Sequence, residues 1–130
     1  MILPVTLCAA AAAALIAIWL MIRVGRVRQS EEISIGDGGN EALTRRMRAH
    51  ANFVESAPFV LILIGAIEFS GKGDPWLAYV AGLYLLGRVA HPIGMEGDPY
   101  GKFRFVGTII TMLTLLGLAV VAGLIAMGVM

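Results

Sequence analysis

The chain has 130 residues, of which 58% are hydrophobic and only 15% are charged, and its mean hydropathy is +0.84. Roughly 45–50% of the residues of a soluble domain are apolar, so this composition excludes an ordinary soluble domain and is typical of a small polytopic membrane protein. The net charge of +1 gives no indication of a nucleic-acid partner. At this length we predict one all-α transmembrane domain over residues 1–130.

Four apolar segments follow one another along the chain, each close to the roughly 20 residues that cross a bilayer as a helix. Helix is the expected spanning structure because every backbone polar group must be satisfied inside the segment. Asn40 and Thr44 are both suitable caps for the second helix, and Pro58 predicts a kink within it. The sequence therefore predicts a bundle of four transmembrane helices at about residues 3–24, 49–69, 76–95 and 103–127.

Basic residues predict how these helices are oriented. No basic residue precedes the first apolar segment, so we interpret it as a retained transmembrane helix and not as a cleaved signal peptide. The second connection contains only Lys72, whereas basic residues crowd the first and third connections and their flanks. By the positive-inside rule, the first and third connections are predicted to be cytoplasmic and both termini to lie outside. The basic residues that carry this prediction are Arg23, Arg26, Arg28, Arg45, Arg46 and Arg48 around the first connection, and Arg88, Lys102 and Arg104 around the third.

A polar stripe precedes the apolar part of the second segment. Arg45, Arg48, Asn52 and Glu55 are spaced three, four and three residues apart. At 100° per residue they lie within an arc of about 80° on one helix face. A charged residue at the centre of a transmembrane helix costs about 2.5–3.5 kcal/mol. The stripe is therefore either a binding site or a set of braces that hold the bundle together.

Other helices contribute polar groups at the same membrane level. Arg26 lies at the end of the first segment, His91 near the end of the third, and Arg104 at the start of the fourth. Guanidinium groups bind carboxylates in a bidentate manner, and Glu55 can receive an amine. This set of groups predicts a ligand that carries carboxylates, with pairing between neighbouring helices as the alternative.

The sequence predicts neither a metal site nor a reactive cysteine. His50 and His91 lie on different predicted helices and lack the cysteine or acid spacing of a metal site, so none is predicted. Cys8 is the only cysteine, which excludes an internal disulfide and favours a packing role.

Two blocks of the sequence resemble the MAPEG family, the membrane-associated proteins of eicosanoid and glutathione metabolism. One block is R-A-H-A-N-F-V-E from Arg48 to Glu55, and the other is G-R-V-A-H from Gly87 to His91. Both are most similar to those of microsomal prostaglandin E synthase, a member of that family. The resemblance implies a homotrimer of four-helix subunits that binds glutathione between adjacent subunits near the cytoplasmic face. The high alanine and glycine content and the short loops favour a bacterial member, which we expect in the inner membrane.

The resemblance also implies roles for individual residues. Arg104 would stabilise the glutathione thiolate, which makes the implied activity that of a glutathione transferase or peroxidase acting on a lipophilic electrophile. Met95 and Phe105 stand where the prostaglandin synthase has a tyrosine and a serine, and Tyr100 is a candidate replacement for the missing phenol. The residues implied to bind glutathione are Arg26, Arg48, Asn52, Glu55 and His91.

Three other functions stay open from the sequence. The first is a non-catalytic membrane protein that binds glutathione or lipid, in keeping with Met95 and Phe105. The second is a transporter of the small multidrug type, which also has four short helices but depends on a carboxylate in its first span, where residues 1–22 have none. The third is a scaffold in which Arg48 and Glu55 are satisfied within one subunit.

Overall fold

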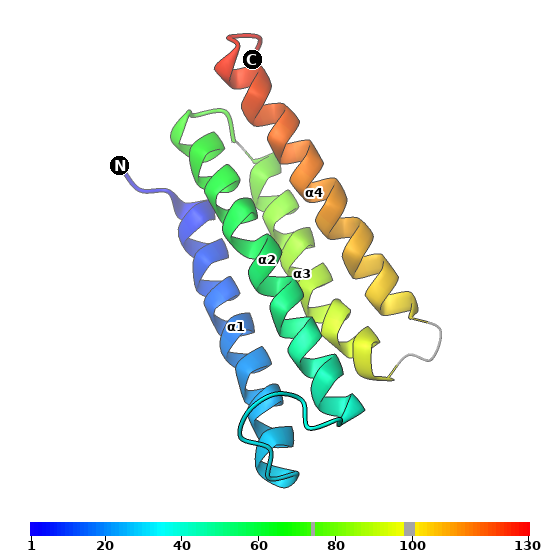
Figure 1. Cartoon of the computed structure of the whole chain (residues 1–130). Helices are drawn as coiled ribbons and strands as arrows, with labels where there is room; N and C mark the ends of the chain where they lie inside the picture. The colour runs from blue at the N-terminus through cyan, green and yellow to red at the C-terminus, as the bar shows by residue number, and fades with distance from the viewer. Residues whose placement is uncertain (74, 98–100) are drawn as a thin grey trace.

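The computed structural model describes residues 1–73, 75–97 and 101–130. Figure 1 shows four helices packed side by side, each antiparallel to the one before it. The C-terminal ends of the first and third helices therefore meet the N-terminal ends of the second and fourth. We call this the arginine end, and the opposite end the far end. The helices are α1 (Pro4–Ser30), α2 (Glu41–Phe69), α3 (Trp76–Gly97) and α4 (Lys102–Ala126).

The all-helical fold agrees with the prediction, and three of the four helices are long and apolar enough to cross a membrane. These are α1, α2 and α4. α3 does not reach the same apolar character, because its C-terminal half carries Arg88 and His91. The four predicted helices are therefore confirmed, and three of them meet the length and hydropathy of a membrane span.

Two helices extend further toward the arginine end than their hydropathy predicted. α1 continues beyond Val24 to Ser30, so Arg26 is a helical residue. α2 begins at Glu41, well before its apolar part, because Asn40 caps it. The Asn40 Oδ1 atom accepts a hydrogen bond from the Leu43 amide at 2.9 Å, which satisfies one of the free amides of the first turn. The arginines of the predicted stripe are thus held on regular helix.

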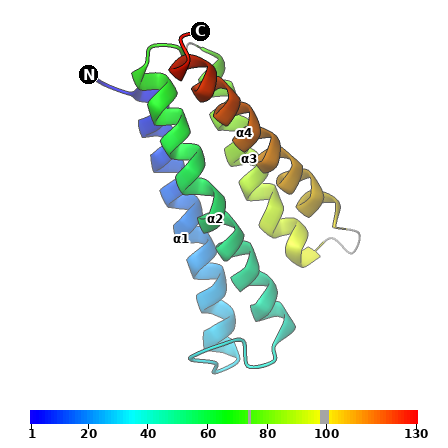
Figure 2. The ribbon, with the colours of Figure 1, turned by 45° about the horizontal axis from the view of Figure 1, so that its top comes forward.

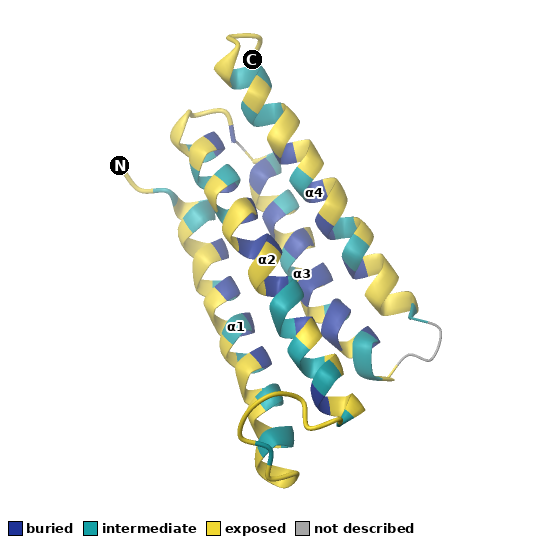
Figure 3. Cartoon of the chain, in the orientation of Figure 1, coloured by how far each residue is buried: buried dark blue, intermediate teal, exposed yellow. Residues whose placement is uncertain are grey.

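The core runs along the interior of the bundle, and the outer faces are largely apolar and exposed (Figure 3). α3 and α4 approach each other closely through glycines. A Cβ atom on Gly107 would lie 2.7 Å from the Gly87 carbonyl oxygen, and one on Gly94 would overlap the Arg104 backbone nitrogen. One buried apolar cluster contains residues from all four helices. Its members are Ala9, Val60, Ile64, Ile67, Leu77, Ala81, Tyr84 and Leu118.

At the far end, a carboxylate from α2 caps the start of α1. Glu68 Oε1 accepts a hydrogen bond from the Val5 amide at 2.8 Å. Glu68 Oε2 accepts from the Thr6 amide at 2.8 Å and from Thr6 Oγ1 at 2.6 Å. Leu3 precedes the helix and supplies no side-chain cap, so Glu68 satisfies the free amides and places a negative charge at the positive end of the helix dipole.

Candidate functional site

The structure divides the predicted stripe on α2 into one paired residue and three free ones. Arg45 pairs with Glu41 at 2.5 Å and donates to the Met95 carbonyl oxygen at 3.1 Å. Arg48 and Glu55 are exposed and Asn52 is half-buried. Within the described part of the chain, these three side chains have no hydrogen bond or ion pair. They are therefore available to a ligand or to another subunit, and they do not brace this subunit internally.

Arg26 and Arg104 are free in the same sense. Arg26 lies on the last turns of α1 and Arg104 on the first turn of α4, so both are at the arginine end (Figure 1). Both residues are exposed. Neither guanidinium bonds to any residue that the structure describes. Three helices thus present unneutralised arginines at one end of the bundle.

His91 lies apart from these exposed groups, in the contact between α3 and α4. It is 3% exposed, and its Cβ atom lies close to Gly107, where an added Cβ would approach it to 2.8 Å. Its Nδ1 atom is buried and has no hydrogen-bond partner among the described residues. A ligand on the surface of one subunit does not reach His91 unless it enters between these two helices.

A buried polar layer lies on the same face of α3 as His91, and the sequence reasoning did not identify the partners of its side chains. Arg88 is 1% exposed and donates from Nη1 to Thr111 Oγ1 at 3.1 Å. The hydroxyl groups of Ser56 and Tyr84 are 2.9 Å apart and hydrogen-bonded. The signal was present in the spacing of Tyr84, Arg88 and His91, four and three residues apart, which places them on one face of α3.

Another feature that the sequence reasoning missed is Glu96, near the end of α3. Its carboxylate forms an ion pair with Arg23 of α1 and another with Arg46 of α2, whose Nε lies 2.8 Å from Glu96 Oε1. Arg46 also donates to the Arg23 carbonyl oxygen at 2.7 Å, and the Arg23 guanidinium lies 4.8 Å from the centre of the Trp19 ring. We call Glu96 with Arg23 and Arg46 the Glu96 clamp.

Neighbouring arginines thus fall into two groups. In the clamp, Arg23 and Arg46 share the one carboxylate of Glu96, and Arg28 is occupied by the Gly36 carbonyl oxygen at 2.8 Å. The free group supplies guanidiniums, one amide and one carboxylate, and these are the groups that pair with an anionic ligand that also carries an amine. Its members are Arg26, Arg48, Asn52, Glu55 and Arg104.

The remaining predictions for this region concern residues around the α3–α4 connection. Met95 is half-buried and Phe105 is exposed, and Tyr100 lies outside the described residues. No group of three or more His, Cys, Asp or Glu side chains that could hold a metal ion occurs in the described ranges.

A bundle of helices, three of them long and apolar enough to cross a membrane, defines the chain as a helical membrane protein with arginines at one end that are unpaired among the described residues. Its sequence matches the profile of the MAPEG family over residues 6–124. The chain therefore belongs to the MAPEG family, whose members are membrane proteins associated with glutathione.

Two curated relatives are similar to part of the chain. Both are described as inner membrane protein YecN, one from Escherichia coli strain K12 and one from Escherichia coli O6:H1 strain CFT073. Each is 34% identical over 74 residues, which is 56% of this chain and 56% of the relative. The match therefore spans about half the length of these relatives.

Proposed function

We propose that the protein is an integral membrane enzyme of the bacterial inner membrane that uses glutathione, as a transferase or peroxidase, on a lipophilic electrophile. The observation that carries the proposal is the set of free polar side chains from three helices at the arginine end. Membership of a glutathione-associated family indicates which anionic ligand to expect. The inner-membrane location is supported by similarity to the YecN relatives, which are inner membrane proteins.

The chemistry of glutathione matches the free side chains. The tripeptide has two carboxylates, one amine and one thiol. Arg26 and Arg48 each supply a guanidinium for a carboxylate, Glu55 supplies a counter-charge for the amine, and the Asn52 amide supplies a donor and an acceptor for a peptide group. His91 stays a predicted contact that requires the ligand to reach between α3 and α4.

The proposed catalytic residue is Arg104, which would lie beside the glutathione sulfur. A free thiol has a pKa of about 8.5, so little thiolate exists at neutral pH. Lowering that pKa by about two units needs about 2.7 kcal/mol, which one partly desolvated guanidinium can supply. The thiolate attacks an electrophilic carbon and forms a C–S bond as the leaving group departs with its electron pair. With a peroxide, two glutathione molecules reduce the O–O bond to an alcohol and water and form a disulfide.

A homotrimer is part of the proposal, because one subunit leaves the site open on its surface. Arg48 and Glu55 are exposed on a helix that is apolar enough to cross a membrane. Exposing charged groups to lipid is unfavourable, so a second subunit that covers this face would reduce the cost and enclose the ligand. We also propose that the arginine end is cytoplasmic, on the strength of the positive-inside rule.

A second candidate function is non-catalytic binding of glutathione or lipid. Met95 and Phe105 favour it, since neither side chain can donate the hydrogen bond that a tyrosine or a serine would direct at the sulfur. This alternative keeps the binding role of Arg48 and removes the catalytic role of Arg104.

The test combines binding and turnover on the purified protein in lipid nanodiscs. Calorimetry measures glutathione affinity, ultraviolet absorbance measures thiolate formation, and conjugation of a generic aryl halide measures turnover. Arg48→Ala should weaken glutathione binding about tenfold or more, the value of one charged hydrogen bond. Arg104→Ala should still bind glutathione but lose thiolate and turnover. Arg28→Ala is the control, because its guanidinium is occupied by loop carbonyls.

Three outcomes decide between the candidates. Absence of glutathione binding to the unaltered protein would overturn the proposed function. Binding without thiolate or turnover would favour the non-catalytic alternative. Full thiolate formation in Arg104→Ala would remove Arg104 from the mechanism.

A further inference from the structure

The Glu96 clamp joins three helices through one carboxylate. Glu96 lies on the last turns of α3, Arg23 on α1 and Arg46 on α2. Each oxygen of the carboxylate faces a different arginine: Oε2 pairs with Arg23 and Oε1 with Arg46. The hydrogen bond from Arg46 to the Arg23 carbonyl oxygen closes the arrangement between α1 and α2. The clamp is therefore a network of three charged groups and not an isolated pair.

Partial burial reduces the screening of this network relative to an exposed ion pair. The contact of Glu96 Oε1 with Arg46 is electrostatic, since this oxygen accepts no hydrogen bond from the described residues. The Glu96 side chain is 25% exposed, against 17% for Arg23 and 26% for Arg46. Exposed pairs contribute little because water and salt screen them, whereas networks with restricted geometry contribute more. Arg45 adds a further tie from α2 to the end of α3 through the Met95 carbonyl oxygen. Three arginines thus hold the C-terminal end of α3.

The end of α3 is in turn packed directly against the start of α4. Gly94 lies so close to Arg104 that a Cβ atom there would overlap the Arg104 backbone nitrogen. In Figure 2 the α1–α2 pair and the α3–α4 pair run apart toward the arginine end. Side-chain ties across this divergence therefore determine how far Arg104 lies from the residues carried by α1 and α2.

We propose that Glu96 is a positioning residue for the site. By holding Arg23 and Arg46, it sets the separation between the glutathione anchors on α1 and α2 and the Arg104 guanidinium on α4. This inference rests on the proposed function, and it adds a residue that contacts neither glutathione nor the electrophile. Loss of the clamp should impair thiolate formation and turnover more than glutathione binding, since Arg26, Arg48 and Asn52 all lie on the α1–α2 side.

The first arm of the test measures helix separation and does not involve glutathione. Spin labels are placed on exposed positions of α2 and α4, at Ala42 and Val106, in a Cys8→Ala background, and labelled chains are diluted with unlabelled ones. Pulsed electron paramagnetic resonance then gives the distance distribution within one subunit. Glu96→Gln should broaden or shift this distribution. The matched control is Glu31→Gln, which removes an exposed carboxylate at the same end and should leave the distribution unchanged.

A second variant separates positioning from a simple change of charge. Glu96→Gln removes a negative charge, whereas the double variant Arg23→Gln with Arg46→Gln removes two positive charges and breaks the same clamp. If position matters, both variants lower the thiolate absorbance of bound glutathione, and both lower kcat by about tenfold or more, since small misplacements of a catalytic group have effects of this order. The dissociation constant for glutathione should change by less than that. Glu96→Asp, which keeps the charge on a shorter side chain, should restore part of the activity.

The outcomes are distinguishable. Unchanged label distances in both clamp variants would overturn the clamp as a determinant of helix separation. Changed distances with normal thiolate and kcat, or opposite effects of the two variants on kcat, would overturn the positioning role. A wild-type protein that fails to bind glutathione would instead overturn the proposed function, and the label distances would still decide whether Glu96 holds the helices.

Discussion

At each end of the bundle, one carboxylate links neighbouring helices, and the two carboxylates have different kinds of partner. At the far end, Glu68 accepts three hydrogen bonds from Val5 and Thr6 at the start of α1. At the arginine end, Glu96 pairs with the guanidiniums of Arg23 and Arg46. The first arrangement completes a helix terminus. The second sits among additional arginines that it does not neutralise.

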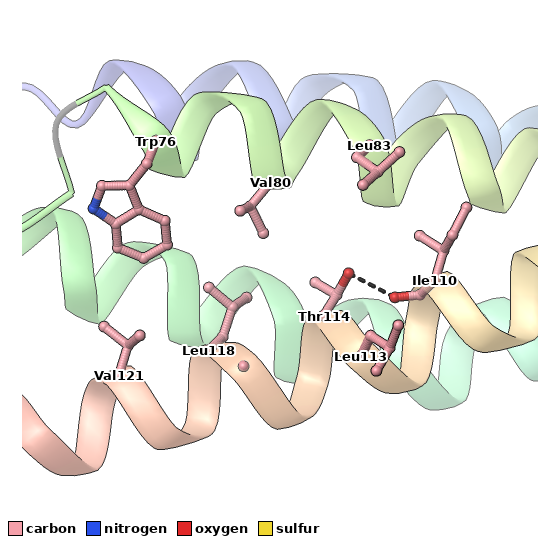
Figure 4. Close-up of a pocket in the computed structure, with 9 residues that line it drawn as sticks. Trp76, Val80, Leu83, Ile110, Leu113, Thr114, Leu118 and Val121 are labelled. Atoms are coloured by element: carbon pink, nitrogen blue, oxygen red, sulfur yellow. Dashed lines mark hydrogen bonds between the residues drawn. The ribbon is translucent and has the colours of Figure 1, made fainter.

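This difference indicates which end of the bundle has charged side chains without partners in the described part of the chain. At the far end, the apolar groove between α3 and α4 has a volume of about 310 Å³ and is lined by side chains such as Trp76, Val80 and Leu118 (Figure 4). Such a surface is satisfied by lipid tails. At the arginine end, Arg26, Arg48 and Arg104 lack partners among the described residues. The unmet electrostatic requirement is therefore concentrated at one end, where we propose the ligand.

The largest effect on stability is expected from adding a methyl group to the close contact between α3 and α4 at the arginine end. Gly94→Ala would place a methyl group against the Arg104 backbone, and overpacking of this kind typically costs about 1–3 kcal/mol. Thermal unfolding in detergent should show a clear loss of stability. Gly117→Ala is the matched control on α4, because nothing lies within 4 Å of its added Cβ. An equal effect of the two substitutions would refute the close contact.

The far end should respond to loss of the α1 cap. Glu68→Ala removes the acceptor of two amides and one hydroxyl, and loss of a helix cap typically costs about 0.5–2 kcal/mol. We expect lower thermal stability and faster amide hydrogen exchange at Val5 and Thr6, with glutathione binding retained. Glu31→Gln, an exposed carboxyl at the other end of α1, should change neither. Weakened glutathione binding in Glu68→Ala would contradict the separation of the two ends.

The buried hydroxyl groups of Ser56 and Tyr84, which lie between the two ends of the bundle, allow the energy of one hydrogen bond to be measured. Tyr84→Phe leaves Ser56 Oγ with only its bond to the Phe53 carbonyl oxygen, at 3.3 Å, and Ser56→Ala removes the partner of the Tyr84 hydroxyl. Each substitution should cost about 1 kcal/mol, whereas the double variant should cost less than the sum, because no hydroxyl is left unpaired. A double-mutant cycle from denaturant unfolding measures the coupling. Strict additivity would mean that the pair does not form.

The smallest effect is expected in the α1–α2 loop and depends on pH. Asp37 accepts a hydrogen bond from the Gly39 amide at 2.9 Å and another from Thr44 Oγ1 at 3.2 Å. These bonds, the backbone one foremost, hold the pKa of the Asp37 carboxyl below its ordinary value of 3.8. Because the pKa is lowered in the folded state, the stabilisation is present at neutral pH and disappears as the pH falls through the folded-state pKa.

The measurement is the difference in melting temperature between the unaltered protein and Asp37→Asn. It should be small and positive at pH 7 and should vanish in strongly acidic buffer. A difference that persists or grows in acid would show that the charge of Asp37 is not what stabilises the loop.

Much of the architecture was predictable from the sequence because it depends on local and periodic features. Apolar runs of about 20 residues specify helices, since a chain in lipid must satisfy its own backbone, and Asn40 caps α2 as its residue type predicts. The spacing of Arg48, Asn52 and Glu55 was sufficient to place them on one face of α2. The membership of the MAPEG family followed from two short blocks of sequence and is confirmed by the family match.

Only the tertiary structure decided which arginines are free and which are occupied. Arg46 and Arg48 are two residues apart on α2, so helical periodicity predicts that they lie on different faces, but the sequence does not show which arginine of α1 or α2 finds an anionic partner. The distinction comes from Glu96, which reaches Arg23 and Arg46 from a third helix and leaves Arg26 and Arg48 without a partner among the described residues. Residue type determines that a guanidinium seeks an anion, but the packing of distant helices determines whether the chain itself supplies one.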